Sequence, residues 1–597
     1  MKELDLKKFY NCRVPYFGSY GKYLVGNSCV KMGGENGDID FLCGPEITAP
    51  RYVENIRFSF AVKEEEAFLH TEVYRVQGEA CYCGFSCLRN TEIYFLDFAS
   101  GYDTWRVFQI RNSSREKIKL KIYVVPLSDE GSASHGVSEG VAILKDTRGW
   151  CFGNKETKNW CLRGVCISVE GASIHKRKEG YLIEKELLPA EKSRVVVRFS
   201  FFSESYRKSV EDIEDAFRNY QRENDSFLSD LSRSLAQIGD EKMRLHVENL
   251  AVNNFIQRGI SVGGYKYANM YLRDCFGALC GYKALGLKQY MSDFFCRLNR
   301  CIEKVSFIPN YFSSDCETFI GKSFHNDCAE LPAYYILFAK IFLEDDRSEL
   351  TKIKKYLDDA FLVQKNFFEK HGYIDFNGDE SEQYCTDKEG QEYGSQAVYE
   401  YFRWSYASFH TMSLALASFR AYGDLFSLWQ DESYKELYLR LKDTIDRLFY
   451  DSDREEYWWA YDVENHSFPE WQVPLYLLTP VWIGAEVTHH DGCVAKAEKY
   501  LNQKGFLPNI ETLCEGFCGH SLAMLLYGLA DENKMEAADR VYSTIMNSGY
   551  LDRYGCVSEF YSPSGIPNGH GYRHYEGGIL IQALLYYYKK KREAMNV

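Results

Sequence analysis

Twelve helical segments of two alternating kinds follow one another from about residue 240 to the end of the chain. One kind, such as 431–449, is amphipathic with a charged face, and the other, such as 516–530, is apolar on most sides. A helix that is apolar all round must be buried between other helices. Six outer helices alternating with six buried inner ones predict an (α/α)6 toroid, in which six helical hairpins close into a ring. The segments are 241–258, 271–285, 287–304, 326–345, 348–370, 394–422, 431–449, 473–487, 493–504, 516–530, 533–548 and 573–591.

In the first 202 residues the apolar side chains recur with a different period, that of a β-strand. Apolar and polar residues alternate in several short runs, which is typical of strands with one buried face. Gly, Asn and Asp clusters separate these runs, so a large antiparallel β-sandwich is expected. The runs 103–112 and 118–127 flank the turn-like "NSSREK", which predicts a hairpin. The expected fold is therefore multidomain α+β, with a β-sandwich domain over 1–202, a helical linker over 203–239 and the toroid over 240–597.

Composition excludes several classes of partner. The chain has 71 Lys and Arg against 85 Asp and Glu, a net charge of −14, which argues against a nucleic-acid or anionic membrane surface. No apolar run reaches the roughly 18 residues needed to span a bilayer. The start "MKELDLKKFYNC" has no apolar signal-peptide core, and the 20 cysteines form no C-x-x-C pair. A cytoplasmic protein is expected, with Cys81, Cys83 and Cys87 packed on a strand.

The segments that lead into the inner helices are rich in acidic, aromatic, Arg and His residues, for example "SFHNDCAELP", "FNGDESEQYC" and "NIETLCEGFCGH". The segments that lead into the outer helices are short and polar. Inner helices of a toroid all point the same way, so the first group would meet at one mouth. This composition suits glycosidic bond cleavage, which needs one carboxylic acid and one carboxylate, while aromatic rings stack on sugars. The sequence has no metal-ligand spacing and no dinucleotide or phosphate-binding motif, so neither a metal nor a cofactor is expected.

Two motifs carry a resemblance to a known family. "YLRDCFGALCGYKALG" looks like the W-x-R-D segment of six-hairpin glycosidases of the glucoamylase type, with Tyr271 in place of Trp. "VSEFYSPSGIPNGHGYRHYEGGIL" resembles the segment around their general base, which matches Glu559. The resemblance implies that Arg273 and Asp274 hold the sugar. It also implies that "NGDESEQY" carries the general acid.

Within that loop Glu380 is the expected acid, with Asp379 and Glu382 as its rivals. Glu576 is the main rival of Glu559, and a buried acid satisfied within the core is its ordinary interpretation. Arg273 and Asp274 also fit a capping acid with a paired arginine. The remaining substrate-binding candidates are Tyr271, Glu330, Asp379, Glu382, Trp459, Trp471, Gln472, Tyr572, His574 and Glu576.

His520 is expected to be a packed core histidine, and Cys514 and Cys518 are expected to be packing residues. The predicted function is an inverting glycoside hydrolase in which Glu380 protonates the leaving oxygen and Glu559 activates water. Inversion would place the two carboxyl groups roughly 6.5–9.5 Å apart. By resemblance the substrate is an α-linked glucoside or related oligosaccharide. A glycoside phosphorylase on the same scaffold and a non-catalytic sugar-binding protein are the alternatives, and the oligomeric state stays open.

Overall fold

The structure, a computed structural model, divides into two compact units. One contains the strands up to β16 together with helices α2 (Ile213–Leu235) and α3 (Glu241–Gln257), and the other contains helices α4 to α16. No helix among the described residues is long and apolar enough to cross a membrane. The described residues are 22–35, 37–44, 53–69, 72–75, 82–88, 91–112, 116–126, 133–138, 141–146, 163–189, 192–202, 212–257, 270–313, 316, 320–321, 330–374, 406–469, 471–508, 516–547, 551, 556–568 and 573–595.

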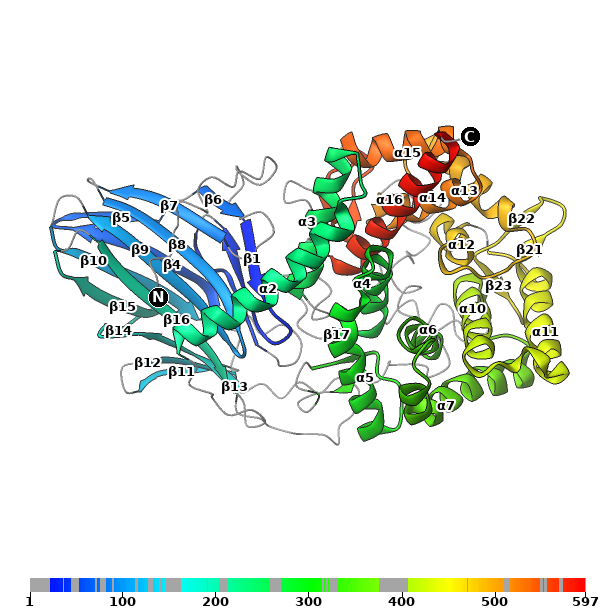
Figure 1. Cartoon of the computed structure of the whole chain (residues 1–597), viewed down its shortest axis with the longest axis horizontal. Coiled ribbons are helices and arrows are strands. Elements are labelled where there is room, and N and C mark those ends of the chain that lie inside the picture. Colours follow the sequence, from blue (N-terminus) through cyan, green and yellow to red (C-terminus); the bar gives the residue numbers. More distant parts are fainter. Residues whose placement is uncertain are drawn as a thin grey trace. The chain divides into compact units, whose positions relative to one another are not determined.

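The first unit is a sandwich of antiparallel sheets (Figure 1). Among the described residues, one sheet has eight strands in the order β11-β12-β13-β16-β9-β8-β7-β6 and the other has five in the order β14-β15-β10-β4-β5. Their inner faces share one apolar core, where Phe58 and Phe108 have ring centroids 5.4 Å apart. The strand bounds are β4 Val53–Val62, β5 Glu65–Phe68, β6 Glu72–Arg75, β7 Tyr82–Leu88, β8 Thr91–Ser100, β9 Asp103–Asn112, β10 Ile118–Pro126, β11 Ala133–Ser138, β12 Val141–Asp146, β13 Arg163–Val169, β14 Ser173–Arg177, β15 Gly180–Leu187 and β16 Lys192–Phe202; β1 Lys22–Gly26, β2 Lys31–Glu35 and β3 Phe41–Cys43 form a small third sheet.

The hairpin expected between 103–112 and 118–127 is wrong. Strand β9 pairs with β8 and β16, whereas β10 pairs with β4 and β15 in the other sheet. The local hairpin is β8–β9, closed at Gly101, whose φ of 54° favours glycine. Both β9 and β10 alternate because each turns one face to the shared core. Alternation therefore identified the strands but not their partners.

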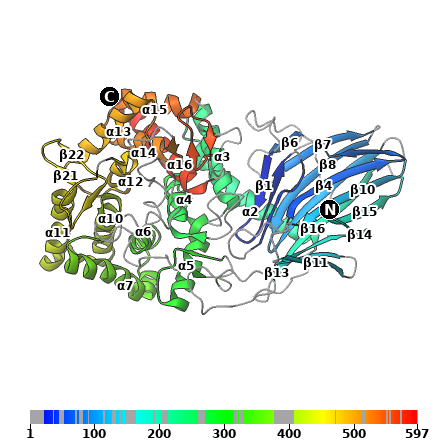
Figure 2. The same ribbon diagram turned by 180° about the vertical axis from the view of Figure 1, so that it is seen from behind.

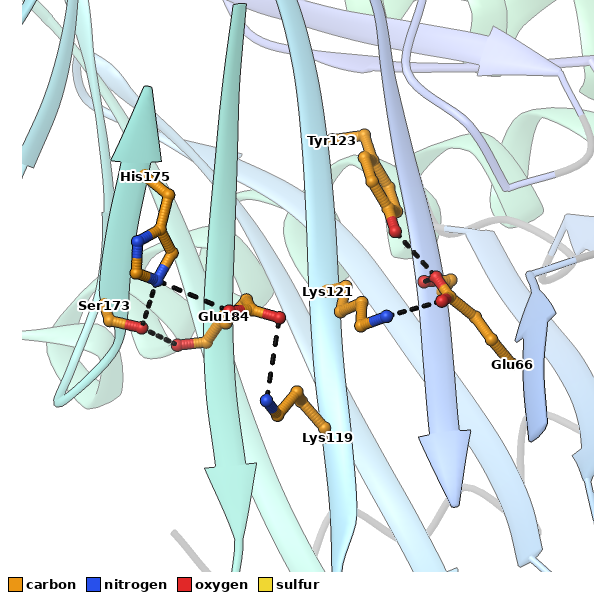
Figure 3. A network of polar contacts seen from close by, with 8 residues as sticks. Glu66, Lys119, Lys121, Tyr123, Ser173, His175 and Glu184 are labelled. Carbon is orange, nitrogen blue, oxygen red and sulfur yellow. Dashed lines mark hydrogen bonds and ion pairs between the residues drawn. The ribbon is translucent and has the colours of Figure 1, made fainter. Parts of the chain in front are cut away.

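The outer face of the five-stranded sheet carries polar side chains in register (Figure 3). Glu66 on β5 accepts hydrogen bonds from Lys121 at 2.5 Å and from the Tyr123 hydroxyl at 2.7 Å, both on β10. Lys119 lies 3.7 Å from Glu184 of β15. Cross-strand pairs of this kind stabilise a solvated sheet face and direct the alternate residues inward.

The second unit is a ring of helices. Contacts run from α4 to α6, α10, α12, α14 and α16, and α16 closes the ring by packing on α4. The view from behind shows α5, α7, α11, α13 and α15 outside these six inner helices (Figure 2). This arrangement confirms the expected β-sandwich followed by an (α/α)6 toroid. The bounds are α4 Leu272–Leu285, α5 Ser292–Val305, α6 Leu331–Leu343, α7 Arg347–His371, α10 Phe409–Phe426, α11 Glu432–Phe449, α12 Thr479–Ile483, α13 His490–Lys504, α14 Ser521–Asp531, α15 Met535–Asn547 and α16 His574–Met595.

Two local features shape the ring. The helix expected over 473–487 is instead a 3-10 turn, η3 (Pro474–Leu478), followed by the short α12. Pro480 has no N–H to donate within the helix, and Gly484 ends α12 with a φ of 72°. Helices α4 and α16 approach so closely at Gly277 and Gly578 that a Cβ on Gly578 would lie 2.1 Å from the Gly277 carbonyl oxygen.

Candidate active site

Polar residues gather where the inner helices begin. Helix α4 starts after Tyr271, which has an extended backbone and whose ring stacks on Tyr311 at 5.1 Å. Arg273 and Asp274 occupy the first turn of α4, and both are buried. The two residues predicted to contact the sugar are therefore buried at the start of the first inner helix. Tyr271 itself is half-buried.

Arg573 is the centre of the first cluster. It directly precedes α16, is 2 % exposed and contacts three carboxylates. Its Nε donates to Glu576 Oε2 at 2.8 Å, and its Nη2 donates to Asp274 Oδ1 at 3.3 Å. Its Nη1 lies 3.4 Å from Glu559 Oε1. One guanidinium thus joins α4, α16 and the segment before β25 (Phe560–Tyr561).

Backbone bonds fix the predicted base in this cluster. The carbonyl of Glu559 accepts a hydrogen bond from Gly519 N at 2.8 Å, which ties it to the start of α14. Arg573 N donates to the carbonyl of Val557 at 3.1 Å, so the arginine and the segment that carries Glu559 are held together. The side chain of Glu559 is 12 % exposed, whereas those of Asp274 and Glu576 are 1 % and 2 % exposed. Glu559 is the carboxylate of the three that reaches solvent most.

The electrostatics of the cluster follow from its burial. Burial raises the pKa of Glu576 to about 7; Arg573 opposes this shift, and the nearby Asp274 and Glu559 carboxylates add to it. Burial alone would lower the pKa of Arg573, but the three surrounding carboxylates outweigh it and keep the pKa above its usual value. The guanidinium therefore stays charged, and Glu576 keeps its proton to a higher pH than an exposed glutamate.

Glu330 is the centre of the second cluster. It lies at the start of α6, and its Oε1 is 3.6 Å from Arg273 Nη1. Its Oε2 is 3.3 Å from His410 Nε2, and His410 Nδ1 is 2.8 Å from Thr479 Oγ1. A tautomer with its proton on Nε2 satisfies both contacts, because it donates to Glu330 and accepts the Thr479 hydroxyl proton. Since Arg273 and Asp274 adjoin each other, the two clusters form one site.

An aromatic wall extends the second cluster. The ring of Tyr476 stacks on His410 at 4.9 Å, and Trp459 stacks on Trp471 at 4.6 Å. Gln472 Oε1 accepts from Trp459 N at 2.9 Å, and its Nε2 donates to the backbone of Tyr457 at 2.9 Å. Both ends of the amide are therefore occupied by the backbone. Trp459 is buried and Trp471 is half-buried, so Trp471 offers more of its surface.

Three histidines lie near the clusters. His574 is fully buried, with Nε2 4.0 Å from Cys275 Sγ. His520 was expected in the core; it is buried, but its Nδ1 lies 4.0 Å from Glu576 Oε1. His410 was not predicted. It stands in the first turn of an inner helix, as Arg273 and Asp274 do.

Arg573 was also missed, although it lies in the quoted segment between Tyr572 and His574. The predicted site rested on acids as catalysts and left out the cation that neutralises them. Several predicted residues lie outside the described ones: Glu380, Asp379, Glu382 and Tyr572, together with Cys514. The predicted separation between the carboxyl groups of Glu380 and Glu559 accordingly stays a prediction.

One group of possible metal ligands occurs among the described residues, away from these clusters. Ligand atoms of His490, Asp491 and Glu532 lie within 4.8 Å of one another near α13. Glu532 already pairs with Lys534 at 2.6 Å. None of the residues of the two clusters belongs to this group.

Comparison with solved structures supports the fold. A bacterial glucoamylase in complex with acarbose aligns with a TM-score of 0.60 at 13 % identity, over 96 % of this chain and 94 % of that protein. A protein from the human microbiome, provisionally named kojibiose phosphorylase, aligns with a TM-score of 0.52 at 10 % identity, over 94 % and 86 % of the two chains. No protein-family model matches the sequence, and neither does any curated protein. The likeness is one of fold.

Proposed function

We propose that this chain, which has the fold of the six-hairpin glycosidases, is an inverting glycoside hydrolase. Its substrate would be an α-linked glucoside or a related short oligosaccharide. The observation that carries the proposal is Glu559, a partly exposed carboxylate at the mouth of the ring, placed 3.4 Å from a buried arginine. A general base must be ionised, must reach water and must be held in place. Arg573 lies beside the side chain, and the Gly519 bond holds the backbone.

The proposed reaction follows the scheme for inversion. Glu380 protonates the leaving oxygen while Glu559 takes a proton from the attacking water on the opposite face of the sugar. Arg273 and Asp274 bind hydroxyl groups of the sugar, and Trp471 stacks on a ring. Arg573 is a positioning residue, because it acts through the carboxylates that it contacts.

A glycoside phosphorylase is the second candidate, and the fold shared with the microbiome protein favours it. A phosphorylase needs cationic groups that can bind phosphate. Arg573, the cation beside Glu559, already contacts three carboxylates, and Arg273 lies beside Glu330. This arrangement supports water over phosphate as the acceptor.

A substrate screen separates these candidates. The full chain would be incubated with aryl glycosides and α-linked oligosaccharides, with and without inorganic phosphate. We expect release of free sugar without phosphate, and a loss of about 10²- to 10⁴-fold in Glu559→Gln. The matched control Glu536→Gln changes a side chain that is 96 % exposed on α15, and it should keep the wild-type rate.

The other outcomes are equally informative. A sugar 1-phosphate formed only with phosphate would replace hydrolysis by phosphorolysis. Binding of sugars without turnover of any of them would favour the non-catalytic sugar-binding protein.

A further inference from the structure

A cavity of about 260 Å³ lies at the other end of the inner helices from the candidate active site, and we call it the base cavity. Its three cationic lining residues follow the active-site residues of the same helices by ten positions: Lys283 follows Arg273, Lys340 follows Glu330 and Arg420 follows His410. At 1.5 Å per residue the two levels are about 15 Å apart. The lining of the base cavity also includes Phe276, Ala417, Asp424, Trp482 and Gln582.

Aromatic rings pack between the base cavity and the active-site level. Phe276 and Trp482, which both line the cavity, have ring centroids 5.9 Å apart. Phe276 also packs on Tyr334 at 5.1 Å, and Trp482 packs on Tyr575 at 6.1 Å. Tyr334 and Tyr575 are buried. These rings form an aromatic wall of the base cavity on the side of the active-site level.

The charges of the base cavity nearly cancel. Lys340 Nζ lies 2.7 Å from Glu344 and 3.1 Å from Asp424, and Arg420 pairs with Glu486. With Lys283, three cations of the lining stand against Asp424, which lines the cavity, and against Glu344 and Glu486, which pair with lining side chains. Helices α4, α6, α10 and α12 also end near the cavity, and the carbonyl groups at helix C-termini disfavour an anion. These features argue for a neutral ligand.

The polar groups that remain suit hydroxyl groups. Lys283 is exposed and forms no ion pair within the described part of the chain, so its ammonium can donate. Gln582 Oε1 accepts from Trp482 Nε1 at 3.0 Å, which leaves the Gln582 amide N–H groups as donors. Asp424 Oδ1 accepts from Trp429 Nε1 at 2.7 Å and its Oδ2 lies 3.1 Å from Lys340, but each carboxylate oxygen can accept a second hydrogen bond. A hydroxyl both donates and accepts, so a polyhydroxy compound uses donors and acceptors together.

We propose that the base cavity is a second binding site, which takes a neutral monosaccharide. The sugar would place its apolar face against Phe276 and Trp482 and its hydroxyl groups against Lys283, Asp424 and Gln582. A mainly apolar pocket with a few convergent polar groups is the usual form of a small-ligand site. The proposal rests on the chemistry of this cavity and holds whether or not Glu559 is a catalytic base.

Equilibrium binding on the full chain tests the proposal. Isothermal titration calorimetry would use D-glucose, D-galactose and D-mannose as neutral probes, with D-glucose 6-phosphate as the anionic comparison. Ala417→Leu fills the cavity, and Lys283→Met removes one donor from an exposed position. For at least one neutral sugar, we expect binding that Ala417→Leu abolishes and that Lys283→Met weakens about tenfold. The same binding should persist in Glu559→Gln.

Three results would overturn the proposal: none of the neutral sugars binds, the sugar phosphate binds more tightly than they do, or Ala417→Leu binds like wild type. Thermal melts check that the variants fold, and a crystal soaked in the bound sugar locates the site without any variant. Measuring hydrolysis beside sugar binding distinguishes the base-cavity proposal from the proposed function. A variant that loses base-cavity binding but keeps hydrolysis supports both, whereas a chain without hydrolysis can still bind sugar in the base cavity.

Discussion

Replacing Glu576 by Gln should change how stability depends on pH. The side chain is 2 % exposed and contacts Arg573 at 2.8 Å, with His520 at 4.0 Å. Asp274 and Glu559 share the same guanidinium. A glutamine of nearly the same shape cannot ionise, so it resembles the protonated acid at every pH.

The sign and size follow from the raised pKa. Burial lifts the pKa of Glu576 from 4.5 to about 7 in the folded chain, so the folded state binds the proton more tightly than the unfolded state. The contribution of Glu576 to stability is therefore largest below the unfolded pKa and is lost as pH rises through the folded pKa. At about 1.36 kcal/mol per pKa unit, wild type should lose on the order of 3 kcal/mol relative to Glu576→Gln between about pH 5 and about pH 8.

Urea denaturation followed by far-UV circular dichroism measures this difference across that pH range. The free energy of unfolding of wild type should fall relative to that of Glu576→Gln as pH rises. Glu536→Gln, at an exposed position, should run parallel to wild type. Parallel curves for wild type and Glu576→Gln would refute the reasoning, since they would mean that Glu576 ionises alike in both states.

Three further substitutions test other parts of the account. Gly578→Ala should cost about 1–3 kcal/mol or more in the free energy of unfolding, because its Cβ would meet the Gly277 oxygen at 2.1 Å. Gly492→Ala, whose nearest new neighbour is 3.8 Å away, should cost nothing, and equal melting temperatures for the two would contradict this packing. Arg106→Met should cost about 3–5 kcal/mol by chemical denaturation, because it leaves Asp97 buried without its two hydrogen bonds of 2.8 and 2.6 Å. The control Arg111→Met loses a surface ion pair with Glu92 and a contact with the Tyr94 ring, and it should cost less than about 1 kcal/mol, so an equal loss would contradict a special role for Arg106. Trp471→Ala should lower kcat/KM roughly tenfold, mainly through KM, if Trp471 stacks on substrate; unchanged steady-state kinetics would exclude that role.

The ring of helices was predictable because its signal is repeated. Each inner helix must be apolar on most sides to fit between its neighbours. The alternation of apolar and amphipathic segments along the sequence therefore indicates which helices are inner and which are outer. The strands of the sandwich were also recognisable, but β9 and β10 were wrongly paired. Any strand of a two-layer sandwich alternates in the same way, and its partner depends on contacts far away in the chain.

The candidate site was predictable in outline only. The segments at the starts of the inner helices were predicted to carry the site. The residues that lie together there are Arg273, Asp274, Glu330, Glu559 and Glu576. Arg573 and His410 were missed because each acts by joining residues distant in sequence. The Arg573–Asp274 contact, for example, spans 299 residues. Several acids buried together need a cation to neutralise them. Arg573, in the same segment as Glu559 and Glu576, is the residue that this requirement would have indicated.

The stereochemistry of the product tests the central claim most directly. Proton NMR would follow the anomeric signals during the first minutes of turnover of an α-linked substrate by the full chain, before the free sugar mutarotates. The account predicts that the β-anomer appears first, because water activated by Glu559 attacks the face opposite the leaving group. Initial release of the α-anomer would contradict inversion and the role of Glu559 as the base.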